Sequence, residues 1–500
     1  MASPVRTTAT RDPSDRGRDC VARQPSVGRR PAEERLVIVS NRLPYSVIER
    51  DDQIEVRPSS GGLATALRRV HARTNGLWIG STGSAELPAV SESEITRRLA
   101  GERLATVCLS ELEITGFYRR YSNGILWPSF HGIEPPTPSD RCGWGMYRAV
   151  NERFADVVAS RWRTGDVLWI HDYQLMLLPK MLRERLPSAR IGFFLHTPLP
   201  PTCDLDAVSE WPDLAAGLLG ADVLGFQTHR DARHFAEWVG ADAGEDGLMG
   251  SVTQMGRSIR LMACPIGVDA AFFDARSRQP TVVARRAALR ASCPGPLFVG
   301  VDRLDYTKGI PERLQAFERL LLAEPDLHGR ARFIQVTVPS REDVRGYRAL
   351  RLHIETLVER INATQATPAW TPVEYVYASI DVDTLVALYG AADIMVVTPK
   401  RDGMNLVAKE FVAARADGGG TLVLSETAGA AAELRAAMLV DPTDVASIES
   451  GYRRALRMSS REARARMRRL RIAVGSRDVF AWADHLLGAL RQPTPADHTS

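Results

Sequence analysis

Short apolar runs, each followed directly by polar or charged residues, recur along this chain and restrict its fold more than any other feature. Examples are residues 167–170 (VLWI) before HDYQ, 191–195 (IGFFL) before HTPLP, and 297–301 (LFVGV) before DRLDYTKG. Stretches with a helical pattern separate the runs. Runs that are apolar throughout are typical of parallel strands that helices cover on both faces. The sequence therefore predicts an α/β protein.

The alternation stops within residues 264–283 and then starts again, which indicates two domains. We expect two Rossmann-like domains that face each other across a cleft, with a boundary near residue 270. The predicted parts are a disordered tail over 1–34, an N-terminal domain over 35–270, a C-terminal domain over 271–475, a helix over 476–490 that packs back on the first domain, and a loose tail over 491–500. Both tails have almost no large apolar residues and cannot bury a core.

Composition excludes several functional classes. The net charge of +4 is small for 500 residues and gives no support to nucleic-acid binding. No apolar run reaches the roughly 18 residues that a membrane span requires. The six cysteines form no CxxC pair, so neither a disulfide framework nor a structural zinc is expected. We expect a cytoplasmic protein without a metal or other cofactor, and we interpret the Arg-rich stretch near the C-terminus as a solvated helix face.

Polar residues gather where the predicted strands end, and this placement indicates a ligand site. In open α/β sheets, ligands bind in the crevice beyond the carboxyl ends of the strands. Arg303 and Lys308 follow one such strand, and Gly309 then opens a helix. A guanidinium and an ammonium group near a helix N-terminus suit a diphosphate. The alternative is that both cations are loop residues paired with Asp302 or Asp305.

The segment RDGMNLVAKE, residues 401–410, follows another apolar strand. Its amides from Gly403 to Leu406 would be free at a helix start, where a phosphate or a sugar hydroxyl fits. Glu410 lies about two turns further on and near the same face, where a carboxylate can accept hydrogen bonds from vicinal hydroxyls such as those of a ribose. The alternative roles are a helix N-cap for Asp402, which does not exclude ligand binding, and an exposed helix charge for Glu410.

Further candidates lie in the first half of the chain. Gly61 and Gly62 precede a helical stretch and permit close approach of a phosphate or sugar to the backbone. Aromatic, basic and acidic residues suited to a phosphorylated sugar are Arg42, Trp78, Tyr118, Trp127, Asp172 and His196. Each alone has an ordinary structural explanation, such as a core aromatic or a buried histidine. Together they describe a sugar-binding side and a phosphate-binding side of one cleft.

Several longer motifs resemble glycosyltransferase family 20, the retaining trehalose-6-phosphate synthases with two Rossmann-like domains of the GT-B type. They are SNRLP, SGGLATAL, YSNGILWPSFH, WIHDYQLMLLPKML, IGFFLHTP, GLLGADVLGFQT, VDRLDYTKGIPERL and VTPKRDGMNLVAKEFVA. The resemblance covers roughly residues 36–490. It implies transfer of glucose from a nucleotide sugar, UDP-glucose above all, to glucose-6-phosphate with retention of configuration.

The resemblance also implies roles for individual residues. The acceptor-binding positions are Arg42, Tyr118, Trp127, Asp172 and Arg341. The donor-binding positions are Gly61, Gly62, Trp78, Arg303, Lys308, Asp402, Gly403, Met404, Asn405, Leu406, Val407 and Glu410. The catalytic positions are His196, Asp402, Arg303 and Lys308, with front-face attack and no metal.

Two alternatives share this framework. The chain has HTPLPPTCDLDAVSEWPD at 196–213, where the family usually has HIPFP and a Phe-containing helix. A sister transferase with another acceptor, such as a glucosylglycerol-phosphate synthase or a cyclitol-phosphate pseudo-glycosyltransferase, therefore stays open. So does a catalytically silent sugar-phosphate sensor. The donor base and a homo-oligomeric state, dimer or tetramer, also stay open.

Overall fold

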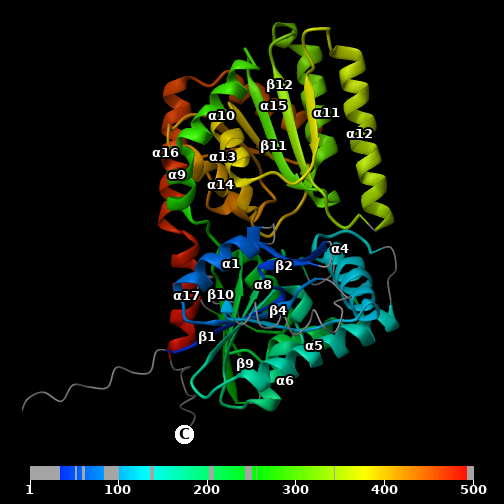
Figure 1. The fold of residues 1–500 in the computed structure, drawn as a ribbon, viewed down its shortest axis with the longest axis vertical. Coiled ribbons are helices and arrows are strands. Elements are labelled where there is room, and N and C mark those ends of the chain that lie inside the picture. The colour runs from blue at the N-terminus through cyan, green and yellow to red at the C-terminus, as the bar shows by residue number, and fades with distance from the viewer. Residues whose placement is uncertain are drawn as a thin grey trace, which may run out of the picture. The chain divides into compact units, whose positions relative to one another are not determined.

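Two β-sheets, each covered on both faces by helices, form the framework of the protein in the computed structural model (Figure 1). The structure describes residues 34–50, 53–58, 62–83, 99, 101–135, 140–201, 208–241, 250–254, 256–342 and 344–492. Gly61 and nearly all of the two predicted tails lie outside these residues. The described residues from Arg35 onward belong to one compact unit, and the domain boundary near residue 270 stays a prediction.

The first sheet has the strand order β5-β4-β1-β6-β7-β8-β10-β9, in which β9 alone is antiparallel to its neighbour. Its strands are β1 Leu36–Arg42, β4 Leu77–Ser81, β5 Leu104–Thr106, β6 Val167–His171, β7 Arg190–Leu195, β8 Val223–Phe226, β9 Gly250–Gln254 and β10 Arg257–Ala263. A separate antiparallel hairpin joins β2 Tyr45–Arg50 and β3 Gln53–Pro58.

The strands of this sheet are apolar throughout because both faces are buried. In β1, Ile38 packs into a core on one side, while Val37 and Val39 pack into a core on the other. The described helices around this sheet are α1 Gly62–Arg73, α3 Glu111–Glu113, the π-helical segment η1 Ile114–Leu126, α4 Trp127–Phe130, α5 Arg141–Arg161, η2 Tyr173–Leu175, α6 Leu178–Arg185, α7 Trp211–Leu218 and α8 His229–Trp238.

The second sheet is entirely parallel, in the order β13-β12-β11-β14-β15-β16. Its strands are β11 Leu297–Arg303, β12 Arg332–Val338, β13 Val373–Tyr377, β14 Ile394–Val397, β15 Thr421–Ser425 and β16 Met438–Val440. The accompanying helices are α9 Ala270–Ser277, α10 Pro280–Ala291, η4 Tyr306–Lys308, α11 Ile310–Ala323, η5 Pro325–Leu327, α12 Arg345–Gln365, α13 Val382–Ala391, α14 Leu406–Ala414, η6 Gly429–Ala432, α15 Val445–Leu456 and α16 Ser460–Ser476.

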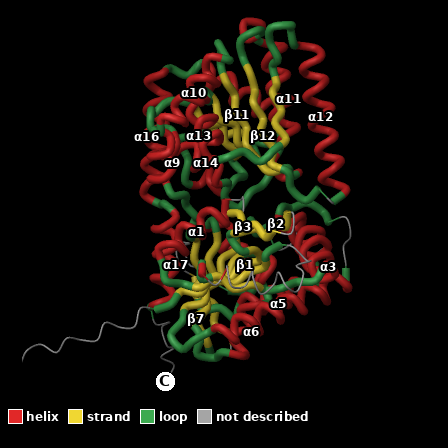
Figure 2. The backbone as a smooth tube through the Cα atoms, viewed as in Figure 1, coloured by secondary structure: helices red, strands yellow, loops and turns green. Residues whose placement is uncertain are grey.

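Helices α11, α12 and α15 cover one face of the second sheet, and α9, α13, α14 and α16 cover the other. Figure 2 shows α11 and α12 on one side of this sheet and α9, α13, α14 and α16 on the other. The core under the second group contains Val299 of β11 and also Trp169 of β6 in the first sheet. One continuous apolar core therefore connects the two sheets.

The last helix, α17 (Val479–Arg491), packs on β7 and β8 and beside α1. Trp482 of this helix contacts Trp169 of β6, with ring centroids 4.7 Å apart. Within the described part of the chain, no helix is both long enough and apolar enough to cross a membrane.

The strand orders show where each sheet can bind a ligand. In the first sheet the chain builds β1, β4 and β5 in one direction and then returns to add β6 beside β1. In the second it builds β11, β12 and β13 and then adds β14 beside β11. The order reverses between β1 and β6 and between β11 and β14, and such switch points are where α/β sheets bind ligands.

Candidate active site

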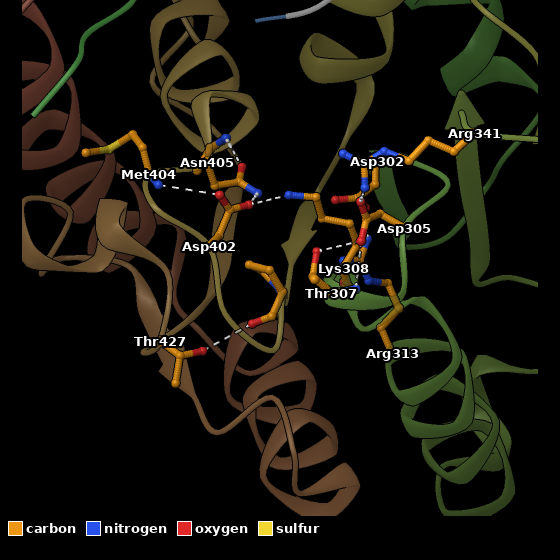
Figure 3. A network of polar contacts seen from close by, with 12 residues as sticks. Asp302, Asp305, Thr307, Lys308, Arg313, Arg341, Asp402, Met404, Asn405 and Thr427 are labelled. Atoms are coloured by element: carbon orange, nitrogen blue, oxygen red, sulfur yellow. Dashed lines mark hydrogen bonds and ion pairs between the residues drawn. The ribbon is translucent and has the colours of Figure 1, made fainter. Parts of the chain in front are cut away.

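The predicted phosphate-binding residues follow the two strands at the switch point of the second sheet. Lys308, after β11, and Asp402, after β14, point toward each other (Figure 3), and Lys308 Nζ lies 2.5 Å from Asp402 Oδ2. Burial raises the pKa of Asp402, but Lys308 outweighs that effect and holds it below its ordinary value. The pair therefore presents one ammonium group and one ionised carboxylate at the same place.

The alternative pairing of Arg303 and Lys308 with Asp302 or Asp305 is wrong. Asp302 pairs with Arg313 inside the second half of the chain. Among the described residues, no carboxylate lies within ion-pair distance of Arg303, whose guanidinium carbon lies 5.8 Å from the ring centre of Trp127. Arg303 is thus an exposed cation that is free to bind an anion.

Asn405, and not Asp402, caps helix α14. Asn405 has a positive φ of 77°, and its side-chain oxygen accepts a hydrogen bond from the amide of Ala408 at 3.2 Å. Asp402 instead accepts from the side-chain amide of Asn405 at 3.2 Å. Because the cap role belongs to its neighbour, the alternative role for Asp402 is wrong and its carboxylate stays at the site.

Two helix N-termini meet beside this pair. Gly62 begins α1, and a Cβ added there would lie 3.0 Å from Leu406 Cδ1 at the start of α14. Gly403 has no room for a side chain at all, because a Cβ would lie 2.1 Å from the backbone oxygen of His196. The glycine therefore allows the β14–α14 loop to touch the first half of the chain, and both helix ends direct positive dipoles to the same region.

Glu410 lies on α14 and is half-buried, so its alternative role as an exposed helix charge is wrong. Its Oε2 accepts a hydrogen bond of 2.9 Å from the Tyr389 hydroxyl, while burial raises its pKa to about 7. Val407, one turn earlier, is partly buried, and Met404 is buried in the core.

The predicted acceptor residues come together around Trp127 at the start of α4. The guanidinium carbon of Arg341 lies 4.5 Å from the Trp127 ring centre. That of Arg42, at the end of β1, lies 5.3 Å from the ring centre of Tyr118. Burial raises the pKa of the Tyr118 hydroxyl, but Arg42, Arg341 and Arg303 together lower it below its ordinary value. Arg42 lies near the phenol, and Arg341 and Arg303 lie near the indole, a surrounding suited to a phosphate.

Asp172 follows β6 with a positive φ of 75°, which turns the chain sharply at the edge of the sheet. Its Oδ1 accepts a hydrogen bond of 3.2 Å from the amide of His196, and burial raises its pKa to about 6. A non-glycine residue in this conformation is costly and indicates a functional constraint.

His196 is held in one neutral tautomer. The amide of Ile266 donates to Gln227 Oε1 at 3.0 Å, so Gln227 Nε2 must donate to His196 Nδ1, 3.2 Å away. His196 Nε2 is then the protonated nitrogen and donates to His171 Nδ1 at 3.1 Å. Burial lowers the pKa of His196 to about 3, which keeps the ring neutral at physiological pH.

Trp78 is not among the residues that the structure brings together. Its side chain is 1% exposed in the core of the first sheet, and its Nε1 donates to Ser40 Oγ at 2.8 Å.

Several residues of the site were missed by sequence reasoning. Asp305 receives hydrogen bonds from Arg341 at 3.4 Å and from Tyr347 at 3.2 Å, and the Tyr173 hydroxyl lies 3.5 Å from Arg341 Nη2. From the sequence, Asp305 is a candidate only as a partner for Arg303 or Lys308. The pairing of Asp305 with Arg341 could not be found from spacing, because it joins two separate loops.

Among the described residues, no group of three or more His, Cys, Asp or Glu could hold a metal ion.

Comparisons with known proteins agree with this geometry. The model of glycosyltransferase family 20 matches residues 34–492. A trehalose-6-phosphate synthase of Mycobacterium marinum is 40% identical over 477 residues, which cover 92% of this chain and 94% of the relative. A bifunctional trehalose-6-phosphate synthase/phosphatase of Thermoproteus tenax is 40% identical over 469 residues, 91% of this chain, which spans only 63% of that relative's length.

Solved structures give the same result. An α,α-trehalose-phosphate synthase (UDP-forming) of Burkholderia xenovorans, in complex with glucose-6-phosphate, superposes with a TM-score of 0.81 at 34% identity, over 91% of this chain and 100% of the other. An E. coli structure bound with UDP-2-fluoro glucose has a TM-score of 0.81 at 32% identity, over 92% and 100%. The predicted α/β fold with two Rossmann-like parallel sheets of the GT-B type is confirmed.

Proposed function

The chain belongs to glycosyltransferase family 20, and we propose that it transfers glucose from UDP-glucose to glucose-6-phosphate, releasing UDP and forming α,α-trehalose-6-phosphate. The observation that carries the proposal is the meeting of a cationic diphosphate site with a cluster of three arginines around a phenol and an indole. Similarity to a trehalose-6-phosphate synthase and to a UDP-forming α,α-trehalose-phosphate synthase supports this proposal over a sister transferase or a silent sensor.

The donor side is built on the second sheet. Arg303 and Lys308 bind the diphosphate, assisted by the amides at the start of α14 and by Gly62 at the start of α1. Charge grows on the diphosphate as the glycosidic bond breaks, and preorganised cations stabilise that charge more than they stabilise the ground state. Asp402 accepts hydrogen bonds from the glucose hydroxyls, and Glu410 accepts from the ribose.

The acceptor side is built on the first sheet, with one contribution from the second. Arg42, Tyr118 and Arg341 bind the phosphate of glucose-6-phosphate. Trp127 presents its indole to the sugar, and Asp172 accepts from its hydroxyls. Because the phosphate carries about two negative charges at neutral pH, the guanidinium groups of Arg42 and Arg341 discriminate strongly against an unphosphorylated sugar.

The proposed reaction retains the α configuration of the donor. The acceptor hydroxyl attacks from the face that the diphosphate leaves, and a diphosphate oxygen takes its proton. Burial lowers the pKa of His196 to about 3, which makes its imidazole a weak base, and its Nδ1 already accepts from Gln227, so it acts as a hydrogen-bonding residue and not as a general base. The backbone oxygen of His196, packed against Gly403, holds the sugar-binding loop in place.

The proposal is tested by assaying release of the nucleoside diphosphate over a panel of donors (UDP-, ADP- and GDP-glucose) and acceptors (glucose-6-phosphate, glycerol-3-phosphate, glucose). We expect release with UDP-glucose only when glucose-6-phosphate is present. Preference for glycerol-3-phosphate would favour the sister transferase, and no release with any pair would favour the sensor.

A further inference from the structure

We infer that Tyr389 is a positioning residue for the ribose of the nucleotide donor and that it acts through Glu410. The inference rests on the proposed function, because it takes Glu410 as the carboxylate that binds the ribose hydroxyls. Neither the sequence motifs nor the comparisons assign a role to Tyr389.

The geometry places the Tyr389 hydroxyl so that it orients one oxygen of the carboxylate. Tyr389 lies on α13 with an exposure of 0%, and its hydroxyl donates to Glu410 Oε2 on α14 at 2.9 Å. The Tyr389 ring packs edge-on against Phe411, with centroids 6.3 Å apart. Its backbone oxygen accepts from Arg415 Nη1 at 3.0 Å. Phe411 therefore holds the ring of Tyr389 and Arg415 holds its backbone, so the hydroxyl has little freedom to follow a moving carboxylate.

The surroundings of Glu410 make this hydrogen bond important. In the described part of the chain, Tyr389 is its one hydrogen-bond partner, and no Lys or Arg pairs with it. Oε2 is occupied by the phenol, and Oε1 is left to accept from a ligand. A carboxylate that receives no hydrogen bond can rotate about its terminal torsion, which has a broad minimum. The Tyr389 hydroxyl removes that freedom before the ligand binds.

Pre-orientation of a binding group increases affinity for the ligand that uses it and leaves other ligands unaffected. Loss of the Tyr389 hydroxyl should therefore weaken UDP binding while hardly changing the binding of a nucleotide that lacks the relevant ribose hydroxyl. A purely structural role would weaken both nucleotides equally. The ratio of the two affinities thus separates positioning from general stability.

The experiment measures dissociation constants of UDP, 2′-deoxy-UDP and 3′-deoxy-UDP by calorimetry for the wild type, Tyr389→Phe, Glu410→Gln and the double variant. For the wild type we expect at least one deoxy nucleotide to bind about 10-fold or more weakly than UDP, as expected for a lost hydrogen bond to a charged group. For Tyr389→Phe we expect that ratio to fall to about threefold or less. In the Glu410→Gln background the tyrosine substitution should have no further effect on the ratio.

Kinetics give a second measurement. Ribose contacts stabilise the ground state and the transition state alike, so Tyr389→Phe should raise KM for UDP-glucose roughly 5- to 10-fold with kcat nearly unchanged. The matched control is Tyr121→Phe, which removes another buried Tyr–Glu hydrogen bond, from Tyr121 to Glu210 Oε2 at 3.4 Å, in the first half of the chain. It should leave the nucleotide ratio unaltered.

The outcomes separate the two proposals. A wild type that does not bind UDP would contradict the proposed function. A wild type that discriminates against a deoxy nucleotide, together with a Tyr389→Phe variant that discriminates equally, would overturn the role of Tyr389 and leave the function intact. Loss of cooperative unfolding in Tyr389→Phe would make the residue structural and would likewise overturn the inference.

Discussion

Lys308 and Asp402 are 94 positions apart in the chain, yet Lys308 Nζ lies 2.5 Å from Asp402 Oδ2. The ion pair joins the loop after β11 to the loop after β14, and these two strands flank the switch point of the second sheet. It is 10% exposed on the lysine side and 15% on the aspartate side. In the function that we propose, this one contact positions a cation for the diphosphate and an anion for the donor sugar.

Arg303→Ala should lower kcat on the order of 100-fold or more, because Arg303 contacts the leaving group most strongly when charge has developed on it. The side chain is exposed and has no carboxylate partner among the described residues, so the melting temperature should hardly change. Arg464→Ala, an exposed arginine on α16, is the control for charge. Near-normal turnover in folded Arg303→Ala would contradict the diphosphate site.

Unphosphorylated glucose should be a poor acceptor, with kcat/KM at least about 100-fold below that of glucose-6-phosphate. The reason is the loss of charge-assisted hydrogen bonds to Arg42 and Arg341, each worth roughly 1.5–3 kcal/mol. Arg42→Ala should reduce the difference in kcat/KM between the two acceptors, because it should raise KM for glucose-6-phosphate alone. Equal use of both sugars by the wild type would show that the arginine cluster does not bind a phosphate.

Asp305→Asn should destabilise the protein by about 3–5 kcal/mol, because it leaves the buried guanidinium of Arg341 without its counter-charge. The two side chains are 0% and 7% exposed. Glu152→Gln removes an ion pair in which the glutamate is 58% exposed, and it should cost less than about 1 kcal/mol. Urea unfolding of both variants measures the two changes in the free energy of unfolding. Similar changes for both variants would show that the Asp305–Arg341 ion pair does not stabilise the fold as a buried pair should.

Affinity for UDP-glucose should rise with pH through about 7, where Glu410 ionises. Burial raises the pKa of Glu410 in the folded protein above its ordinary value of 4.5. The protonated side chain therefore adds to the free energy of unfolding below pH 4.5, and this contribution is lost as pH rises through 7. Ribose binding requires the ionised form, so affinity should increase up to about 10-fold between pH 6 and 8. Glu410→Gln should abolish this dependence, and an unchanged slope would contradict the role of Glu410.

The fold was largely predictable from the sequence, because strands buried on both faces must be apolar throughout, as Val37, Ile38 and Val39 illustrate. The residues that follow the strands were predictable for the same reason: polar side chains directly after a buried strand must lie at its carboxyl edge. Arg303, Asp172 and Asp402 were predicted in this way.

Pairings between loops were not predictable. The contact of Lys308 with Asp402 depends on the strand order, which places β14 beside β11 and not beside β13. Trp78 was predicted to bind the donor but packs in the core, because the sequence cannot distinguish an indole that binds a sugar from one that packs in a core. The hydroxyl of Tyr389 likewise gives no local signal, because its partner lies on the next helix.

The most direct test of the account is the product formed from UDP-glucose and glucose-6-phosphate by the full-length protein. We predict stoichiometric UDP and a non-reducing disaccharide phosphate, with both anomeric protons in the α configuration by NMR. Lys308→Ala and Asp402→Ala should each abolish most of this product while the protein stays folded. Transfer to a different acceptor, a β-configured product, or no transfer by a protein that binds both substrates would contradict the account.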